Sequence, residues 1–179
     1  MNKEGMPINR TWRVWGAAIA LAFNVGAAGA QGVDVAKLIP DAAEVVSARI
    51  ALMPPGLRFR VAPTETTLLT FGCHVSEDGK RIAALLDVLK SNLQNDDGDV
   101  SRFFVNNGVF LKLRSGATVK FTFGGAEHRN NRIHGWADNG KPSESMYFFS
   151  QAGLLTALER WAGNDLVEKK DGQWCVANR

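Results

Sequence analysis

The chain has 179 residues, of which 45% are hydrophobic and 22% are charged, with a formal net charge of +3. This composition is that of an ordinary globular protein and excludes global disorder, and the length suits one domain with a substantial core. No concentrated basic cluster occurs, so the charge pattern gives no reason to expect nucleic-acid binding.

The first thirty residues have the three parts of a secretory signal peptide. Basic residues precede an apolar run at residues 14–25, and residues 28–30 (Ala-Gly-Ala) form a small-x-small cleavage site. The alternative is a membrane anchor, but the run is shorter than the roughly 20 apolar residues of a span, and it contains Asn24. We expect residues 1–30 to be removed. Residues 31–179 then form one periplasmic or secreted domain with net charge +1 and no membrane span.

Two cysteines, Cys73 and Cys175, remain in the mature chain. An even number of cysteines in an oxidising compartment predicts a disulfide, which would close a loop of about 100 residues and tie the C-terminal tail to the middle of the domain. The alternative is a reactive Cys73 activated by its neighbour His74. A sequence neighbour seldom has good geometry for a catalytic base, which favours the disulfide.

The first half of the mature chain reads as a mixture of short elements. Residues 31–40 are expected to be an extended start. Residues 41–52 are predicted to be a helix capped by Asp41, and residues 57–61 alternate apolar and basic residues as a half-buried strand does. Residues 64–73 fit either a short helix capped by Thr64 or a buried strand.

The next segment contains the clearest helix and the clearest strand of the sequence. Residues 82–93 carry one apolar stripe at helical spacing, followed by a polar loop at 94–99. Residues 103–113 read as strand, with a tight turn or a bulge at 106–108, and residues 118–123 alternate cleanly. The inward positions of that last strand are Val119, Phe121 and Phe123.

Two further strands and a helix complete the domain. Residues 132–138 and 146–149 are predicted strands, separated by a turn at Asn139-Gly140, and a final helix is predicted between a Ser150 cap and Gly163. We therefore predict an α+β domain. Its antiparallel sheet would have about four to six strands, with two or three helices packed on one face.

Residues 125–138 gather the side chains best suited to binding. If 132–138 is a regular strand, four of its side chains share one face, and types such as Arg and Trp dominate binding hot spots. The alternative is a solvated hairpin with Trp136 packed at the edge of the sheet. The candidate binding residues are Arg132, His134, Trp136 and Asp138, together with His128 and Arg129 in the preceding loop.

Other chemistry in this stretch is less well supported. His128, His134 and Asp138 could ligate a metal, but their spacing matches no ligand motif, and the neighbouring Arg129 and Arg132 would repel a cation. We expect neither a metal nor a cofactor.

Two aromatic pairs, at residues 103–104 and 148–149, put one ring on each face of a strand. The outward ring of each pair has to be covered by another part of the protein, or it contributes to an interaction patch.

The mature sequence contains none of the short motifs of common enzymes, such as G-x-S-x-G, H-E-x-x-H, a P-loop or C-x-x-C. We therefore expect an exported, non-catalytic binding protein that acts on an envelope or secreted protein, comparable in size and compartment to inhibitor and immunity proteins. One alternative is a small envelope hydrolase using His134 with Glu127 or Asp138. Another is a structural component of an envelope assembly.

The disulfide and the cleavage can be tested on one sample. Protein purified without reductant from the exported fraction should begin at Gln31 and yield one crosslinked peptide pair joining Cys73 to Cys175, as seen by mass spectrometry. Two alkylatable thiols, or a chain that still begins at Met1, would contradict these predictions.

Overall fold

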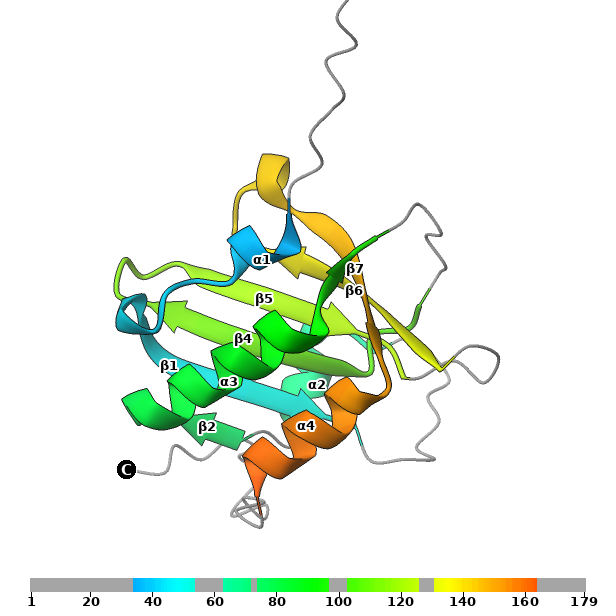
Figure 1. Ribbon diagram of the computed structural model, residues 1–179, viewed down its shortest axis with the longest axis horizontal. Helices are drawn as coiled ribbons and strands as arrows, with labels where there is room; N and C mark the ends of the chain where they lie inside the picture. The colour runs from blue at the N-terminus through cyan, green and yellow to red at the C-terminus, as the bar shows by residue number, and fades with distance from the viewer. Residues whose placement is uncertain (1–33, 54–62, 72–73, 97–102, 126–130, 164–179) are drawn as a thin grey trace, which may run out of the picture. The chain divides into compact units, whose positions relative to one another are not determined.

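Seven antiparallel strands form one sheet, in the spatial order β2-β1-β4-β5-β6-β7-β3 (Figure 1). The computed structural model describes residues 34–53, 63–71, 74–96, 103–125 and 131–163, all within the unit Gly32–Arg179. The strands are β1 (Val45–Leu52), β2 (His74–Ser76), β3 (Gln94–Asn95), β4 (Asn107–Leu113), β5 (Thr118–Phe123), β6 (Arg132–Asp138) and β7 (Met146–Gln151). The α+β class is confirmed, although the sheet has more strands than the four to six expected.

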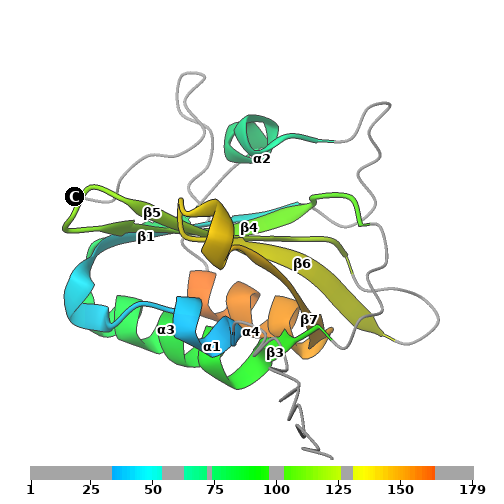
Figure 2. The same cartoon turned by 90° about the horizontal axis from the view of Figure 1, so that it is seen from above.

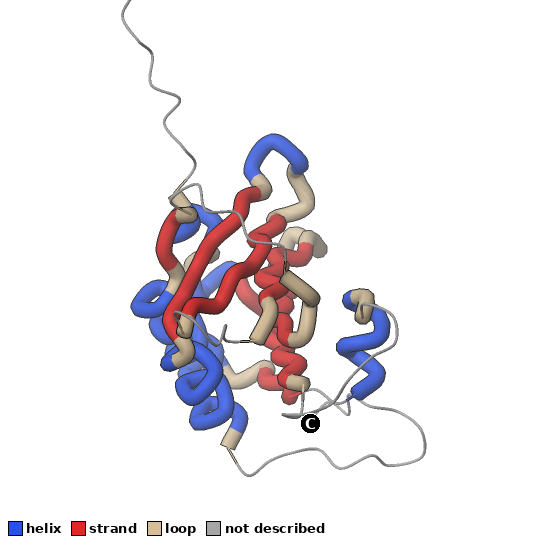
Figure 3. Tube along the Cα trace, turned by 90° about the vertical axis from the view of Figure 1, so that its right-hand side faces the viewer, coloured by secondary structure: helices blue, strands red, loops and turns tan. Residues whose placement is uncertain are grey.

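Helices lie on both faces of this sheet (Figures 2 and 3). The α-helices α1 (Val35–Leu38), α3 (Gly79–Asn92) and α4 (Gly153–Ala162) cover one face, here called the inner face, whereas α2 (Glu65–Phe71) packs against the other, outer face. Two or three helices were expected on one face and three lie there, but a helix on the other face, α2, was not expected. Leu68 of α2 is 2% exposed and forms a small apolar cluster with Ala51 and Phe110, which holds α2 on the outer face.

Residues 41–52, expected to form a helix, instead form a short 3-10 turn (Ala42–Glu44) and the strand β1. Its alternating residues Ala48 and Ile50 are fully buried in the inner core, and Ala51 is buried under α2 on the outer side. β1 pairs with β2 and β4, and a register shift between Val45 and Ser47 interrupts its period-two alternation, while its outer side carries Ser47 and Arg49 beside Ala51. That pattern resembles a helical stripe, and the β-branched residues Val45 and Ile50 favour the strand.

The start of the domain is also more ordered than expected. Residues 35–38 form α1 instead of an extended segment, with Val35 and Leu38 buried. The backbone N–H of Val35 donates to Oδ1 of Asn95, at 2.7 Å. Asn95 belongs to β3, a two-residue strand formed where the sequence predicts only a loop.

The Asn106-Asn107-Gly108 segment forms neither a tight turn nor a bulge. Asn107 and Gly108 are the first two residues of β4 and keep regular pairing with β1 and β5. The buried Asn107 side chain accepts a hydrogen bond from the N–H of Met53 at 3.1 Å and donates to the carbonyl of Gly124 at 3.0 Å. This asparagine therefore joins two chain segments at one end of the sheet.

The helices α2, α3 and α4 were all expected from the sequence, and only one predicted cap is wrong. Residues 65–71 are helical, and Oγ1 of Thr64 accepts from the N–H of Thr67, as the capped-helix alternative requires. Ser150 does not cap α4, because it is a fully buried residue of β7 and Ala152 takes the cap position. Gly163 ends α4 with a positive φ of 65°, as predicted.

Reciprocal hydrogen bonds join α3 to α4. Nε1 of Trp161 donates to the carbonyl of Arg81 at 2.7 Å, and Nη2 of Arg81 donates to the carbonyl of Trp161 at 3.0 Å. The guanidinium also lies 5.2 Å from the indole centroid. Trp161 packs against the inner core, as its place in the apolar stripe predicts.

The inner core is centred on Phe148. Its ring makes edge-on contacts with Phe121 and Phe123, at centroid distances of 6.2 and 6.4 Å. Gly135 lies directly opposite Phe148 on β6. A methyl group on Gly135 would come within 2.7 Å of Cε1 and Cε2 of that ring, and closer still to Cζ. The ring therefore rests on bare backbone, an arrangement that only glycine allows.

Several expectations fall outside the described residues. They are the strand at residues 57–61, the disulfide between Cys73 and Cys175, and the C-terminal tail.

Substituting Gly135 should test the centre of the core. Gly135→Ala is expected to lower the free energy of unfolding by about 1–3 kcal/mol, because the Phe148 ring has to move out of its position. Gly79→Ala is the matched control, since nothing lies within 4 Å of its added methyl group and it begins a helix. Urea denaturation measures both. Equal stability of Gly135→Ala and the unsubstituted protein would show that the ring can move at no cost.

Candidate functional site

The binding residues predicted within the segment 132–138 lie on a regular strand. β6 spans Arg132–Asp138, the same bounds as the sequence predicts. Ile133 and Ala137 are buried in the inner core, so the alternating residues face the outer side of the sheet. These outward residues are Arg132, His134, Trp136 and Asp138.

Arg132 is held against an aromatic ring. Its guanidinium carbon lies 3.8 Å from the centroid of Phe149, on the neighbouring strand β7. Register places Phe149 opposite His134, so Arg132 reaches diagonally across the strand pair. A cation over an aromatic face gains about 0.5–2 kcal/mol, depending on how far it is shielded from water.

Trp136 makes a second pair with β7. It lies directly opposite Tyr147, and the two rings meet edge to face with centroids 4.6 Å apart. Tyr147 is 42% exposed. We call the four residues that these two pairs comprise the aromatic patch: Arg132, Trp136, Tyr147 and Phe149.

His134 lies between these pairs but is only 4% exposed. A ligand at the surface would therefore meet the rings and the guanidinium before it met this imidazole. The imidazole is therefore less accessible than the Tyr147 ring beside it.

Asp138 serves the adjoining turn. Its Oδ1 atom accepts hydrogen bonds from the N–H of Gly140 at 2.7 Å and from the hydroxyl of Ser145 at 3.1 Å. Four residues along a strand span about 13 Å, so Asp138 lies well away from His134. This separation argues against a catalytic pair formed by His134 and Asp138.

The loop residues of the expected site cannot be placed. Glu127, His128 and Arg129 lie outside the described residues. The expected pairing of His134 with Glu127 therefore stays a prediction.

The outward rings of the two aromatic pairs have different surroundings. Phe149 is partly covered by Arg132, whereas Phe104 is 70% exposed. Phe104 precedes β4, near the end of β5, where the N–H of Asn106 donates to the carbonyl of Phe123. It is an exposed apolar side chain that belongs to neither of the two pairs of the patch.

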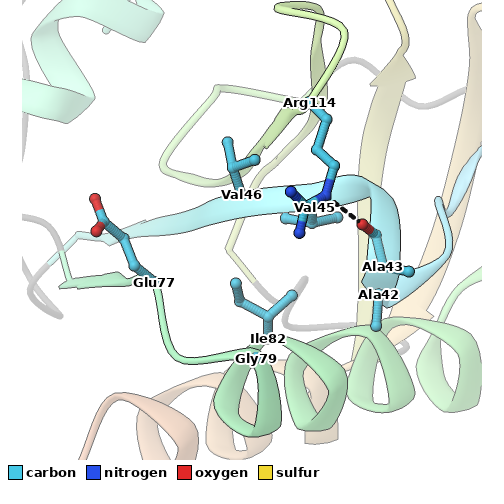
Figure 4. Close-up of a pocket in the computed structure, with 8 residues that line it drawn as sticks. All are labelled: Ala42, Ala43, Val45, Val46, Glu77, Gly79, Ile82 and Arg114. Carbon is cyan, nitrogen blue, oxygen red and sulfur yellow. Dashed lines mark hydrogen bonds between the residues drawn. The ribbon is translucent and has the colours of Figure 1, made fainter.

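A cavity of about 600 Å³ lies between the start of β1 and α3 (Figure 4). Its charged side chains, Glu77 and Arg114, lie apart with Val46 between them in this view, and the remaining lining is apolar or glycine. Nε of Arg114 donates to the carbonyl of Ala43 at 2.7 Å, which commits this guanidinium to holding the chain before β1. The cavity therefore lacks a converging set of chemical groups.

The described part of the chain contains neither a metal-ligand cluster nor a membrane-spanning helix. Among these residues no group of three or more His, Cys, Asp or Glu side chains is arranged to hold a metal ion. None of the helices in these segments is long and apolar enough to cross a bilayer.

No protein family, curated protein or solved structure matches this chain. The chemistry of its own residues is therefore the basis for assigning a function.

The sequence predicted both strands of the patch and pointed to the outward ring of the pair at residues 148–149, but it did not point to Tyr147. Arg132 and Trp136 were found from their alternation, whereas Tyr147 was not singled out. The signal was present, because Tyr147 and Phe149 alternate with the buried Phe148 on β7. What the sequence lacked was the β6–β7 register that sets Tyr147 opposite Trp136.

The turn beside the patch contains a carboxylate that should titrate abnormally. Hydrogen bonds from Asn139 and then from Lys141 lower the pKa of Glu144 below its ordinary value of 4.5. These contacts therefore favour the folded state above that ordinary value, and the contribution is lost as the pH falls through the lowered pKa. Asn139→Ala should raise the pKa of Glu144, and Lys141→Gln should raise it by less. NMR titration of the Glu144 side-chain carbon measures both, and an unshifted pKa in Asn139→Ala would contradict this account.

Proposed function

We propose that this protein is an exported, non-catalytic binding protein that uses the outer face of β6 and β7 to hold a polypeptide partner. The observation that supports this proposal is the aromatic patch. The patch presents the Arg132 guanidinium over the Phe149 ring, and the Trp136–Tyr147 pair with Tyr147 exposed. It lies on β6 and β7, whereas α2 packs against β1 and β4.

The composition of the patch suits a protein partner. Trp, Tyr and Arg are the residue types most enriched where alanine substitution costs the most binding energy. Both aromatic contacts also hold their side chains in place before binding, which reduces the conformational entropy that association has to overcome. A complementary partner would offer a carboxylate to Arg132 and an apolar side chain to Trp136 and Tyr147.

The placement of His134 and Asp138 favours binding over hydrolysis. His134 is buried, and Asp138 is occupied by the turn. A general base has to lie within hydrogen-bonding distance of the substrate proton that it removes. For a substrate bound at the surface of the sheet, neither His134 nor Asp138 is placed in this way. Export to the periplasm or the medium is inferred from residues 1–30 and completes the proposal.

The partner can be isolated with the tagged full-length protein, expressed in cells that naturally make it, and then titrated in purified form. The double variant Arg132→Gln/Trp136→Leu should weaken this association by at least about 30-fold, the loss expected when hot-spot residues costing about 2 kcal/mol are removed. Leucine keeps an apolar side chain beside Tyr147, so the thermal midpoint should change little.

The control is Lys80→Gln/Lys90→Gln on α3, at the opposite side of the sheet. It should bind as the unsubstituted protein does. Undiminished binding by the Arg132/Trp136 variant, with binding lost in the α3 control, would place the interface elsewhere and refute the proposal.

A further inference from the structure

A second feature of the outer face lies beside α2, over β1, β4 and β5. It is a cavity of about 290 Å³, which we call the basic groove. Two successive rows of the sheet supply its floor. Arg49, Phe110 and Lys120 form one row, and Lys112 and Thr118 lie in the next.

The groove concentrates positive charge. Diagonal neighbours on adjacent strands lie about 7–8 Å apart, so Lys112 is close to both Arg49 and Lys120. The one acidic side chain of the lining is Glu65, whose Oε2 is 3.0 Å from Nζ of Lys120. Within the described segments, Arg49 and Lys112 form no ion pair with a carboxylate, which leaves the groove with two uncompensated positive charges.

Like charges on neighbouring strands repel one another, and only Lys120 has a carboxylate partner here, so the folded state gains nothing from placing Arg49 and Lys112 together. A bound anion would remove the repulsion. The long side chains of Arg49 and Lys112 can both reach an anion held above Phe110, and a guanidinium with an ammonium group is a common arrangement for phosphate. Thr118 adds a hydroxyl donor at the rim.

The remaining properties of the groove define the class of ligand. Its volume is near the lower limit of about 300 Å³ for small-molecule sites, and Leu69 of α2 gives it an apolar wall beside the Phe110 ring of the floor. Two positive charges match a dianion. We infer that the basic groove binds a small organic dianion of the phosphate monoester class, with the phosphate between Arg49 and Lys112 and the organic part against the wall.

This site goes beyond the proposed function, because its residues come from β1, β4, β5 and α2 and none belongs to the aromatic patch. Either site can fail without the other.

Isothermal titration calorimetry of the full chain with phenyl phosphate, inorganic phosphate and phenol tests the inference. We expect one phenyl phosphate per chain, weaker binding of inorganic phosphate, and none of phenol. Arg49→Gln and Lys112→Gln should each weaken phenyl phosphate binding at least tenfold. Lys112 is exposed, so its variant stays informative if the Arg49 variant fails to fold.

Glu65→Gln is the variant with the opposite expectation. Removing the only carboxylate of the lining frees Lys120 and should tighten phenyl phosphate binding severalfold. Its ion pair is partly exposed, and such pairs contribute only about 0–1 kcal/mol to folding, so the variant should remain folded. A purely structural role of Glu65 would not produce tighter binding.

Lys90→Gln on α3 is the charge-matched control and should bind as the unsubstituted protein does. The inference is overturned if phenyl phosphate does not bind, or if Lys90→Gln weakens it as much as Lys112→Gln. Binding of a long polyanion such as heparin without binding of phenyl phosphate would also overturn it, because the face would then be a surface for a macromolecule.

Discussion

The contact between the Phe148 ring and the backbone of Gly135 is the constraint on which the rest of the structure depends. It brings β6 and β7 together at the centre of the inner core, with Phe121 and Phe123 packed around the ring. Because the pairing register is fixed there, the opposite side of the same strands is fixed as well. Trp136 and Tyr147 meet on the outer face only because their neighbours in the chain, Gly135 and Phe148, meet on the inner one.

The two faces of the sheet differ in composition and in what covers them. The inner face is covered by α1, α3 and α4 and supplies the apolar burial that stabilises the fold. On the outer face, α2 packs against β1 and β4, and its Glu65 pairs with Lys120 of β5, whereas the aromatic patch lies on β6 and β7. The groups of the outer face fall into two sets, cations beside α2 and aromatic rings on the far strands, which accounts for two separate proposals on one surface.

The sequence predicted best where a residue's surroundings are set by its immediate neighbours. β5 and β6 were found with correct bounds, and β5 has one buried face and a strict alternation. α3 was found from its stripe, and Gly163 from the need for a positive φ after a helix. The prediction failed at β1, where a register shift between Val45 and Ser47 interrupts the alternation that distinguishes a strand.

The sequence by itself determined the α+β class, the periodic elements and the face of β6 that carries Arg132 and Trp136. Only the tertiary structure decided that β1 is a strand, that α2 lies opposite the other helices, and that Tyr147 completes the patch. It alone brought Arg49, Lys112 and Lys120 together from three strands. The reason is that periodicity is a local property of the chain, whereas register and layer are set by contacts between residues as far apart as Glu65 and Lys120.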